Sequence, residues 1–203
     1  MEKEVRLTIA GSAGRGSDAR FMKVAIYNQM VMMATSYLYD NGLKQVCSGG
    51  AAFGDHVAVS LVVSGIIPAS SLVLYFPERF CLLTKKFASS PVGRTTNRYH
   101  GLFSEATQRD SLGEIAWCIQ NGAKPVTGGG FQKRNTSMAL FPGAEGRLLA
   151  FTSGPSGCQK PSFILNEFGP NILASTAGLK ISRGTADTWD KSLSPKAHIK
   201  LGF

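Results

Sequence analysis

Apolar runs and helical spacing alternate along the first part of the chain. Residues 5–10 (VRLTIA) predict a buried strand, and residues 45–48 and 71–76 predict two more. Residues 19–39 and about 55–64 have the spacing of helices between them, the first ending at Asn41-Gly42. Because such strands are joined by right-handed crossovers, the pattern predicts an α/β, Rossmann-like, mostly parallel sheet flanked by helices.

The regular pattern is lost from residue 78 to about 110. This stretch is basic, rich in Ser and Thr and dotted with aromatic residues, and it predicts a long irregular insertion with at most one helical turn. A length of 203 residues and 43% apolar residues suit one domain over 1–203 that contains this insertion.

Shorter elements are expected after the insertion. They are helices at 111–121 and 135–140, a strand at 147–152, a Gly/Pro-rich loop to about 177, a short strand at 179–182, a helix at 185–191 and a terminal edge strand at 198–201.

Four Gly/Ser/Thr turns stand at expected strand-to-helix junctions. They are Gly11-Ser12-Ala13-Gly14, Ser48-Gly49-Gly50, Gly128-Gly129-Gly130 and Gly184-Thr185-Ala186. In a parallel sheet such turns share the carboxyl edge, where backbone N–H groups and helix N-termini attract phosphate. The turns therefore predict a nucleotide cradle, whereas the plain alternative is that the glycines only serve tight turns.

Several common sites are excluded. GSAGRGSD has a shifted spacing relative to GxGxxG, and GxxxxGK[ST] is absent. The sequence therefore does not favour an ordinary NAD-dependent dehydrogenase or a P-loop NTPase. The four cysteines, Cys47, Cys81, Cys118 and Cys158, form no CxxC pair, and we expect neither a metal site nor a bound cofactor.

A net charge of +9 favours an anionic ligand, although no Lys/Arg block indicates a nucleic-acid tail or a lipid patch. No leader segment and no apolar run of about 18 residues is found, so a cytoplasmic protein without a membrane partner is expected.

Five segments together resemble the SLOG superfamily, and within it the YspA/YpsA-related group. They are IAGSAGRG (9–16), CSGGAAFGDHVAV (47–59), FQKRNTSMA (131–139), LLAF (148–151) and SRGTADTWDK (182–191). The resemblance implies a Rossmann-like domain that binds a nucleotide or NAD-derived ligand and commonly forms homo-oligomers. It also implies a role as a sensor or, since no effector domain accompanies it, as a sequestering protein in anti-phage defence or counter-defence.

The resemblance and the turns nominate ligand-binding residues in four loops. They are Gly11, Ser12, Arg15, Ser48, Gly49, Gly50, Asp55, Arg134, Asn135, Gly184, Thr185, Ala186 and Asp187. Arg134 offers a fork for phosphate, and Asn135 can donate and accept toward a base or ribose. The plain alternatives are a salt bridge from Arg134 to Asp55 or Asp187, and helix capping by those two acids.

Catalysis is the alternative hypothesis. The PGGxGTxxE motif of LOG-type phosphoribohydrolases is absent, but Glu114 at the start of a helix is similar to the nucleophile of nucleoside deoxyribosyltransferases and related N-glycosidases. The plain alternative is that Glu114 is a solvated residue in the first turn of this helix, where the helix dipole favours a negative charge. A weaker hypothesis, single-stranded DNA binding as in DprA-like proteins, depends on Tyr99 and Phe103 near Arg94 and Arg98.

Overall fold

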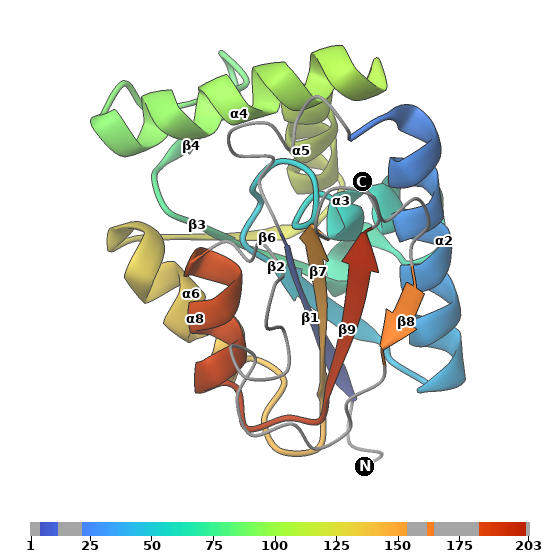
Figure 1. Ribbon diagram of the computed structural model, residues 1–203. Helices are drawn as coiled ribbons and strands as arrows, with labels where there is room; N and C mark the ends of the chain where they lie inside the picture. The colour runs from blue at the N-terminus through green and yellow to red at the C-terminus, as the bar shows by residue number, and fades with distance from the viewer. Residues whose placement is uncertain (1–4, 12–21, 154–161, 165–182, 202–203) are drawn as a thin grey trace.

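A seven-stranded sheet forms the centre of the molecule (Figure 1). The computed structural model describes residues 5–11, 22–153, 162–164 and 183–201. In sheet order the strands are β6 (Lys124–Thr127), β3 (Leu72–Phe76), β2 (Gln45–Ser48), β1 (Arg6–Gly11), β7 (Arg147–Ser153), β9 (Lys196–Leu201) and β8 (Ser162–Ile164). All neighbouring pairs are parallel except β8 and β9, so the predicted Rossmann-like α/β fold is confirmed.

Helices cover both faces of this sheet (Figure 1). One side carries α2 (Val24–Asp40), α3 (Val57–Val63) and α5 (Ser111–Gln120), and the other carries α6 (Gly130–Leu140) and α8 (Arg183–Lys191). A short 3₁₀ turn, η1 (Ala69–Ser71), precedes β3. Helix α4 (Pro91–Thr107) crosses above the carboxyl ends of the strands. None of the helices within the described residues is long and apolar enough to cross a membrane.

Alternate residues of the central strands pack in two separate hydrophobic cores, one on each face of the sheet. Leu7 and Ile9 of β1 join the large cluster beneath α2 and α3, whereas Ala10 packs with Met138 of α6 on the opposite face. Strand β7 divides in the same way, because Leu149 belongs to the large cluster and Leu148 packs against α8. This two-residue period is what a strand covered on both faces requires.

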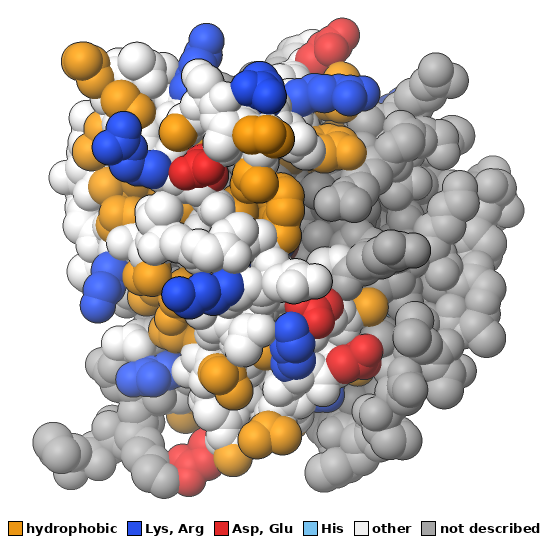
Figure 2. Space-filling model, turned by 90° about the vertical axis from the view of Figure 1, so that its left-hand side faces the viewer, with side chains coloured by type: hydrophobic (Ala, Val, Ile, Leu, Met, Phe, Trp, Pro, Cys, Tyr) orange, Lys and Arg blue, Asp and Glu red, His pale blue; other side chains and the backbone are white. Residues whose placement is uncertain are grey.

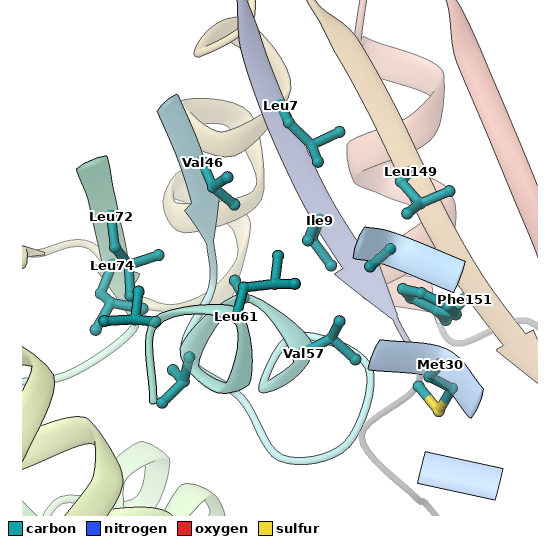
Figure 3. Packing of buried hydrophobic residues seen from close by; sticks show 14 of the residues in the cluster. Leu7, Ile9, Met30, Val46, Val57, Leu61, Leu72, Leu74, Leu149 and Phe151 are labelled. Carbon is teal, nitrogen blue, oxygen red and sulfur yellow. The ribbon is translucent and has the colours of Figure 1, made fainter. Parts of the chain in front are cut away.

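The large cluster fills the space between the sheet and its first helical layer (Figure 3). Figure 3 labels Leu7, Ile9, Val46, Leu72, Leu74, Leu149 and Phe151 from the strands, with Met30 of α2 and Val57 and Leu61 of α3. These side chains hold the strands and helices at fixed positions, so the loops at the carboxyl ends have a rigid base.

The expectation of an irregular insertion at 78–110 is wrong. This segment forms a short hairpin of β4 (Phe80–Cys81) and β5 (Lys86–Phe87), followed by the 17-residue helix α4. The helix has a strong start, because Ser90 accepts a hydrogen bond from Gly93 N and Pro91 occupies the first turn. Its buried side consists largely of Thr, His and Gly, which conceals the helical period from a hydrophobicity pattern.

Three smaller expectations also need correction. Strand β6 was missed because Pro125 interrupts a short, largely exposed segment, which an edge strand tolerates. Helix α6 begins at Gly130 rather than at residue 135. Strand β9 is not an edge strand, since β8 pairs with its outer side. The short strand expected at 179–182 lies outside the described residues.

Candidate functional site

A cavity of about 390 Å³ opens at the carboxyl end of β1. Strands β2, β3 and β6 lie on one side of β1, and β7 and β9 lie on the other, so this end of β1 is the point where the strand order reverses. Ligands of open α/β sheets bind at such switch points. The lining comes from β1 (Ala10, Gly11), the loop after β2 (Ala51, Ala52, Asp55), α4 (Thr96, Tyr99), α6 (Phe131, Gln132, Arg134, Asn135, Met138) and α8 (Gly184, Thr185, Asp187, Thr188).

Gly11 and Asp55 join the first two predicted turns. Gly11 N donates a hydrogen bond of 2.9 Å to Asp55 Oδ1. A Cβ at Gly11 would lie 2.5 Å from Gly54 Cα, so only glycine lets the end of β1 approach the next loop this closely. Burial raises the pKa of the Asp55 carboxyl, while Arg134 and the amides of nearby backbone oppose that rise.

Arg134 ties helix α6 to the same loop. Its Nη1 lies 3.7 Å from Asp55 Oδ2 and donates to the carbonyl of Gly49 at 3.4 Å. Its Nε and Nη2 donate to Asn135 Oδ1 at 3.2 and 2.9 Å. The plain alternative for Arg134, a salt bridge to Asp55, is therefore present, although both side chains also line the cavity.

Asp187 continues this network into helix α8. Its Oδ2 accepts a hydrogen bond of 3.2 Å from Asn135 Nδ2, and its Oδ1 lies 2.8 Å from Lys191 Nζ. Asp187 stands in the middle of α8 and does not cap it, and the capping position of α3 belongs to His56 rather than Asp55. Capping therefore does not explain either acid.

Two aromatic side chains face the cavity, and sequence reasoning did not assign them to a ligand site there. Tyr99 comes from α4 and Phe131 from the first turn of α6, and each is half-buried. The guanidinium carbon of Arg134 lies 5.5 Å from the centre of the Phe131 ring. The signal for Tyr99 was available in the Ser-Pro start of α4, which places Thr96 and Tyr99 three residues apart on one face.

Other predicted residues are not part of the described lining of the cavity. The hydroxyl of Ser48 accepts a hydrogen bond from Gly50 N, and Gly49 and Gly50 are buried. Gly50 adopts a φ of 59°. Ala186 packs in the cluster beneath α8. Ser12 and Arg15 lie outside the described residues.

The third predicted turn, at 128–130, places none of its three glycines in the lining. Its contribution comes from Phe131 and Gln132, which directly follow it at the start of α6.

Glu114 lies outside the described lining of the cavity. Its Oε2 is 2.8 Å from Nε2 of buried His56, and its Oε1 is 2.8 Å from Nη2 of Arg109. Burial opposes ionisation of Glu114, but these two partners outweigh it and hold the pKa of the carboxyl below its ordinary value. Glu114 is in the first turn of α5, as the plain reading expected, yet it is ion-paired and only 17% exposed.

Two of the three histidines come together in space, although their sequence spacing showed no pattern. The ring centres of His56 and His100 are 5.9 Å apart. His100 Nε2 lies 3.0 Å from the carbonyl oxygen of Gly50, and its Nδ1 lies 3.1 Å from Ser111 Oγ. His100 therefore supports the loop that forms one wall of the cavity. No group of three potential metal ligands occurs among the residues that the structure describes.

Comparison with known proteins adds one relative. An uncharacterized protein of Acanthamoeba polyphaga mimivirus is 28% identical over 195 residues, which cover 93% of this chain and 91% of that protein. No family model matches the chain, and no solved structure matches it. The similarity extends over nearly the whole fold and assigns no activity.

Proposed function

We propose that this protein binds a nucleotide or NAD-derived nucleotide in the cavity at the end of β1, as a sensor or a sequestering protein. The observation that carries the proposal is the convergence of Gly11, the loop after β2 and the start of α8 at the switch point of the sheet. The cavity volume of about 390 Å³ falls within the usual range of small-molecule sites.

The chemistry of the walls matches the parts of a nucleotide. Gly184 and Thr185 stand in the first turn of α8, where backbone N–H groups and the helix dipole favour a phosphate. Tyr99 and Phe131 offer ring surfaces for a base. Asp187 supplies a carboxylate that can accept hydrogen bonds from ribose hydroxyls, and Asn135 Nδ2 orients it by donating to its Oδ2.

The charge of the lining favours such a mixed ligand over a simple polyanion. The charged side chains in the described lining are Asp55, Arg134 and Asp187, that is, one cation and two acids. Arg134 is paired with Asp55, and Asp187 is paired with Lys191. A ligand with hydroxyl and amino groups beside its phosphate therefore suits the site better than an inorganic polyphosphate does.

Binding is favoured over N-glycosidic cleavage. The candidate nucleophile, Glu114, is engaged by His56 and Arg109 and does not line the cavity. An attacking carboxylate would have to reach the anomeric carbon of the bound ligand. The mimivirus relative brings no activity to this proposal, because its own name assigns none.

A ligand panel tests the proposal. AMP, ADP, ADP-ribose and NAD would each be added to the protein, and both the melting temperature and the release of free base would be measured. We expect a saturable rise in melting temperature with at least one of them and recovery of that ligand intact. No shift with any of the four at millimolar concentration would refute nucleotide binding.

A matched pair of variants on α8 connects binding to the cavity. Asp187→Asn changes a lining residue, whereas Asp190→Asn removes the same charge from an exposed position outside the lining. We expect the first substitution to weaken the binding of the stabilising ligand and the second to leave it unchanged. Equal effects of the two substitutions would place the ligand elsewhere.

A further inference from the structure

A stretch without acidic residues forms the hairpin and the first part of α4. From Arg79 to Ser104 the chain contains five basic residues, namely Arg79, Lys85, Lys86, Arg94 and Arg98, and no Asp or Glu. Figure 1 places α4 and β4 together at one end of the molecule, and Figure 2 shows Lys and Arg side chains along the upper part of the neighbouring face. The stretch from Arg79 to Ser104 therefore carries a net positive charge.

A groove runs along α4 within this basic region. We call it the α4 groove, and its described lining consists of Lys86 of β5, of Arg94, Asn97, Arg98, His100, Gly101 and Ser104 of α4, and of Asp110 and Leu112 after α4. The hollow has a volume of about 470 Å³. Arg94 and Arg98 are exposed and stand one helical turn apart, while exposed Lys86 comes from the hairpin. The space beside Gly101 is open, since a Cβ there would meet nothing within 4 Å.

The cations of the α4 groove are not neutralised within the described residues. No ion pair joins Lys86, Arg94 or Arg98 to an acidic side chain in that part of the chain. Nη1 of Arg94 donates to a backbone carbonyl, that of Ser89. Asp110 also lines the groove, where its Oδ1 accepts the hydrogen bond of 3.0 Å from Gly113 N that caps α5, so the described lining holds three cationic side chains and one acidic one. Arg94 and Arg98 therefore repel each other, and a bound anion would relieve that repulsion.

We propose that the α4 groove binds the phosphate backbone of a nucleic-acid strand without reading its sequence. A row of cations suffices for this kind of binding, because each neutralised phosphate releases counterions. The described lining has no Trp, Tyr or Phe of the kind that dominates protein interfaces, its His100 is fully buried, and Leu112 is its one aliphatic residue. These features favour a phosphodiester strand over an acidic protein.

The described lining of the α4 groove offers no exposed aromatic ring on which a base could stack. Phe103 is fully buried against Tyr27, Phe53 and His56, and Tyr99 lines the cavity at the end of β1 instead. The two aromatic residues that sequence reasoning associated with single-stranded DNA are therefore not in the lining of the α4 groove. Binding through phosphates alone is expected to accept both single strands and duplexes.

Fluorescence anisotropy with the whole chain tests the proposal. The probes are a labelled mixed-sequence oligonucleotide of about 20 nucleotides and its duplex, titrated from about 50 to 200 mM salt. We expect wild-type protein to bind both, and the double substitution Arg94→Gln/Arg98→Gln to weaken binding at least about tenfold and to flatten the salt dependence. Both arginines are exposed, so the melting temperature of the variant should stay near that of the wild type.

Two further variants separate the groove from general charge. Lys23→Gln/Lys124→Gln removes the same charge at exposed positions outside the groove and should leave most of the affinity. Gly101→Leu should fill part of the open space beside Gly101 and weaken binding with no loss of net charge. Equal losses in the two double variants, or full affinity with Gly101→Leu, would overturn the proposal.

Binding to lipid vesicles tests the competing possibility that this end of the protein contacts an anionic membrane surface. Leu83 is 92% exposed at the turn of the hairpin, beside Lys85 and Lys86, which is a feature that an anionic lipid surface could also use. Binding to phosphatidylserine vesicles with no binding to either oligonucleotide would refute the nucleic-acid proposal. The AMP-to-NAD panel should give the same melting shifts with Arg94→Gln/Arg98→Gln as with wild type, because the α4 groove and the cavity do not share those side chains.

Discussion

Arg134 Nη1 and Asp55 Oδ2 lie 3.7 Å apart, and this ion pair connects α6 to the loop after β2 across the floor of the cavity. Both side chains are at most 9% exposed. Because buried charges are costly when unpaired, each residue keeps the other in place. The pair therefore has a structural role in addition to any contact with a ligand.

A double-mutant cycle measures this coupling. Asp55→Asn and Arg134→Met should each lower the free energy of unfolding by about 3 kcal/mol, because each leaves its partner buried without a counter-charge. The double variant should lose clearly less than the sum, by more than about 1 kcal/mol. Urea unfolding of the four proteins gives the values. If the losses of the two single variants sum to the loss of the double variant, the two side chains do not depend on each other.

Glu114→Gln should affect stability but not ligand binding. The amide can still accept a hydrogen bond from His56, but it loses the charge that pairs with Arg109, so we expect a loss of about 1 kcal/mol. The ligand-induced rise in melting temperature should equal that of wild type. Glu105→Gln, an exposed change on α4, is the control. Base release by wild type that disappears in Glu114→Gln would instead establish Glu114 as a nucleophile.

The parts of the fold that the sequence predicted well are those with a continuous apolar signal. Strands β1, β2 and β7 were predictable from the sequence because both of their faces are covered, so that consecutive residues are apolar. Helix α4 was missed because its buried side uses Thr96, His100 and Thr107, whose hydrogen bonds replace aliphatic packing. Its Ser90-Pro91 start was the better guide.

The candidate site was predictable as a set of loops but not as a set of contacts. Gly11, Gly184 and Thr185, which the turn chemistry nominated, all line one cavity. The meeting of His56 with Glu114 depends on how α3 packs against α5, which one sequence does not reveal. The same holds for Tyr99, whose contribution to the cavity requires α4 to cross the carboxyl ends of the strands.

His100 should make the protein less stable in acid. Burial, with a smaller effect of the nearby His56, lowers the pKa of His100 from 6.5 to about 3, whereas the unfolded chain takes up its proton near 6.5. The contribution of His100 to the free energy of unfolding is therefore fully present above pH 6.5. It is lost as the pH falls toward 3, at about 1.4 kcal/mol per pH unit. Urea unfolding at several pH values between 3 and 6.5 gives the slope of the free energy of unfolding against pH.

His100→Gln separates this residue from its neighbours. Among the groups around His100, the titratable one in ring contact with it is His56, which is in turn paired with Glu114 beside Arg109. Burial also lowers the pKa of His56, so part of the acid sensitivity should persist. The slope of the variant should be smaller than that of wild type by up to about 1.4 kcal/mol per pH unit. Identical slopes would mean that His100 is protonated in the folded protein.

Tyr99 should provide affinity for the base of the ligand. Base–aromatic stacking contributes about 1–3 kcal/mol, so Tyr99→Ala should weaken AMP binding by roughly tenfold or more, while Tyr99→Phe should keep most of the affinity. Ribose 5-phosphate, which has no base, should bind both variants as it binds wild type. Isothermal titration calorimetry gives the affinities. Thr95→Ala, exposed on the same helix and outside the lining, should change neither ligand.

The comparison of AMP with ribose 5-phosphate distinguishes two kinds of failure. If wild-type protein binds neither compound nor any other nucleotide, the proposed function fails and Tyr99 has no base to contact. If wild type binds AMP and Tyr99→Ala binds it equally well, only the stacking role of Tyr99 fails, and the base must contact another wall, of which Phe131 is the remaining aromatic residue among those described. A parallel loss of both ligands would indicate that Tyr99 shapes the cavity as a whole rather than recognising the base.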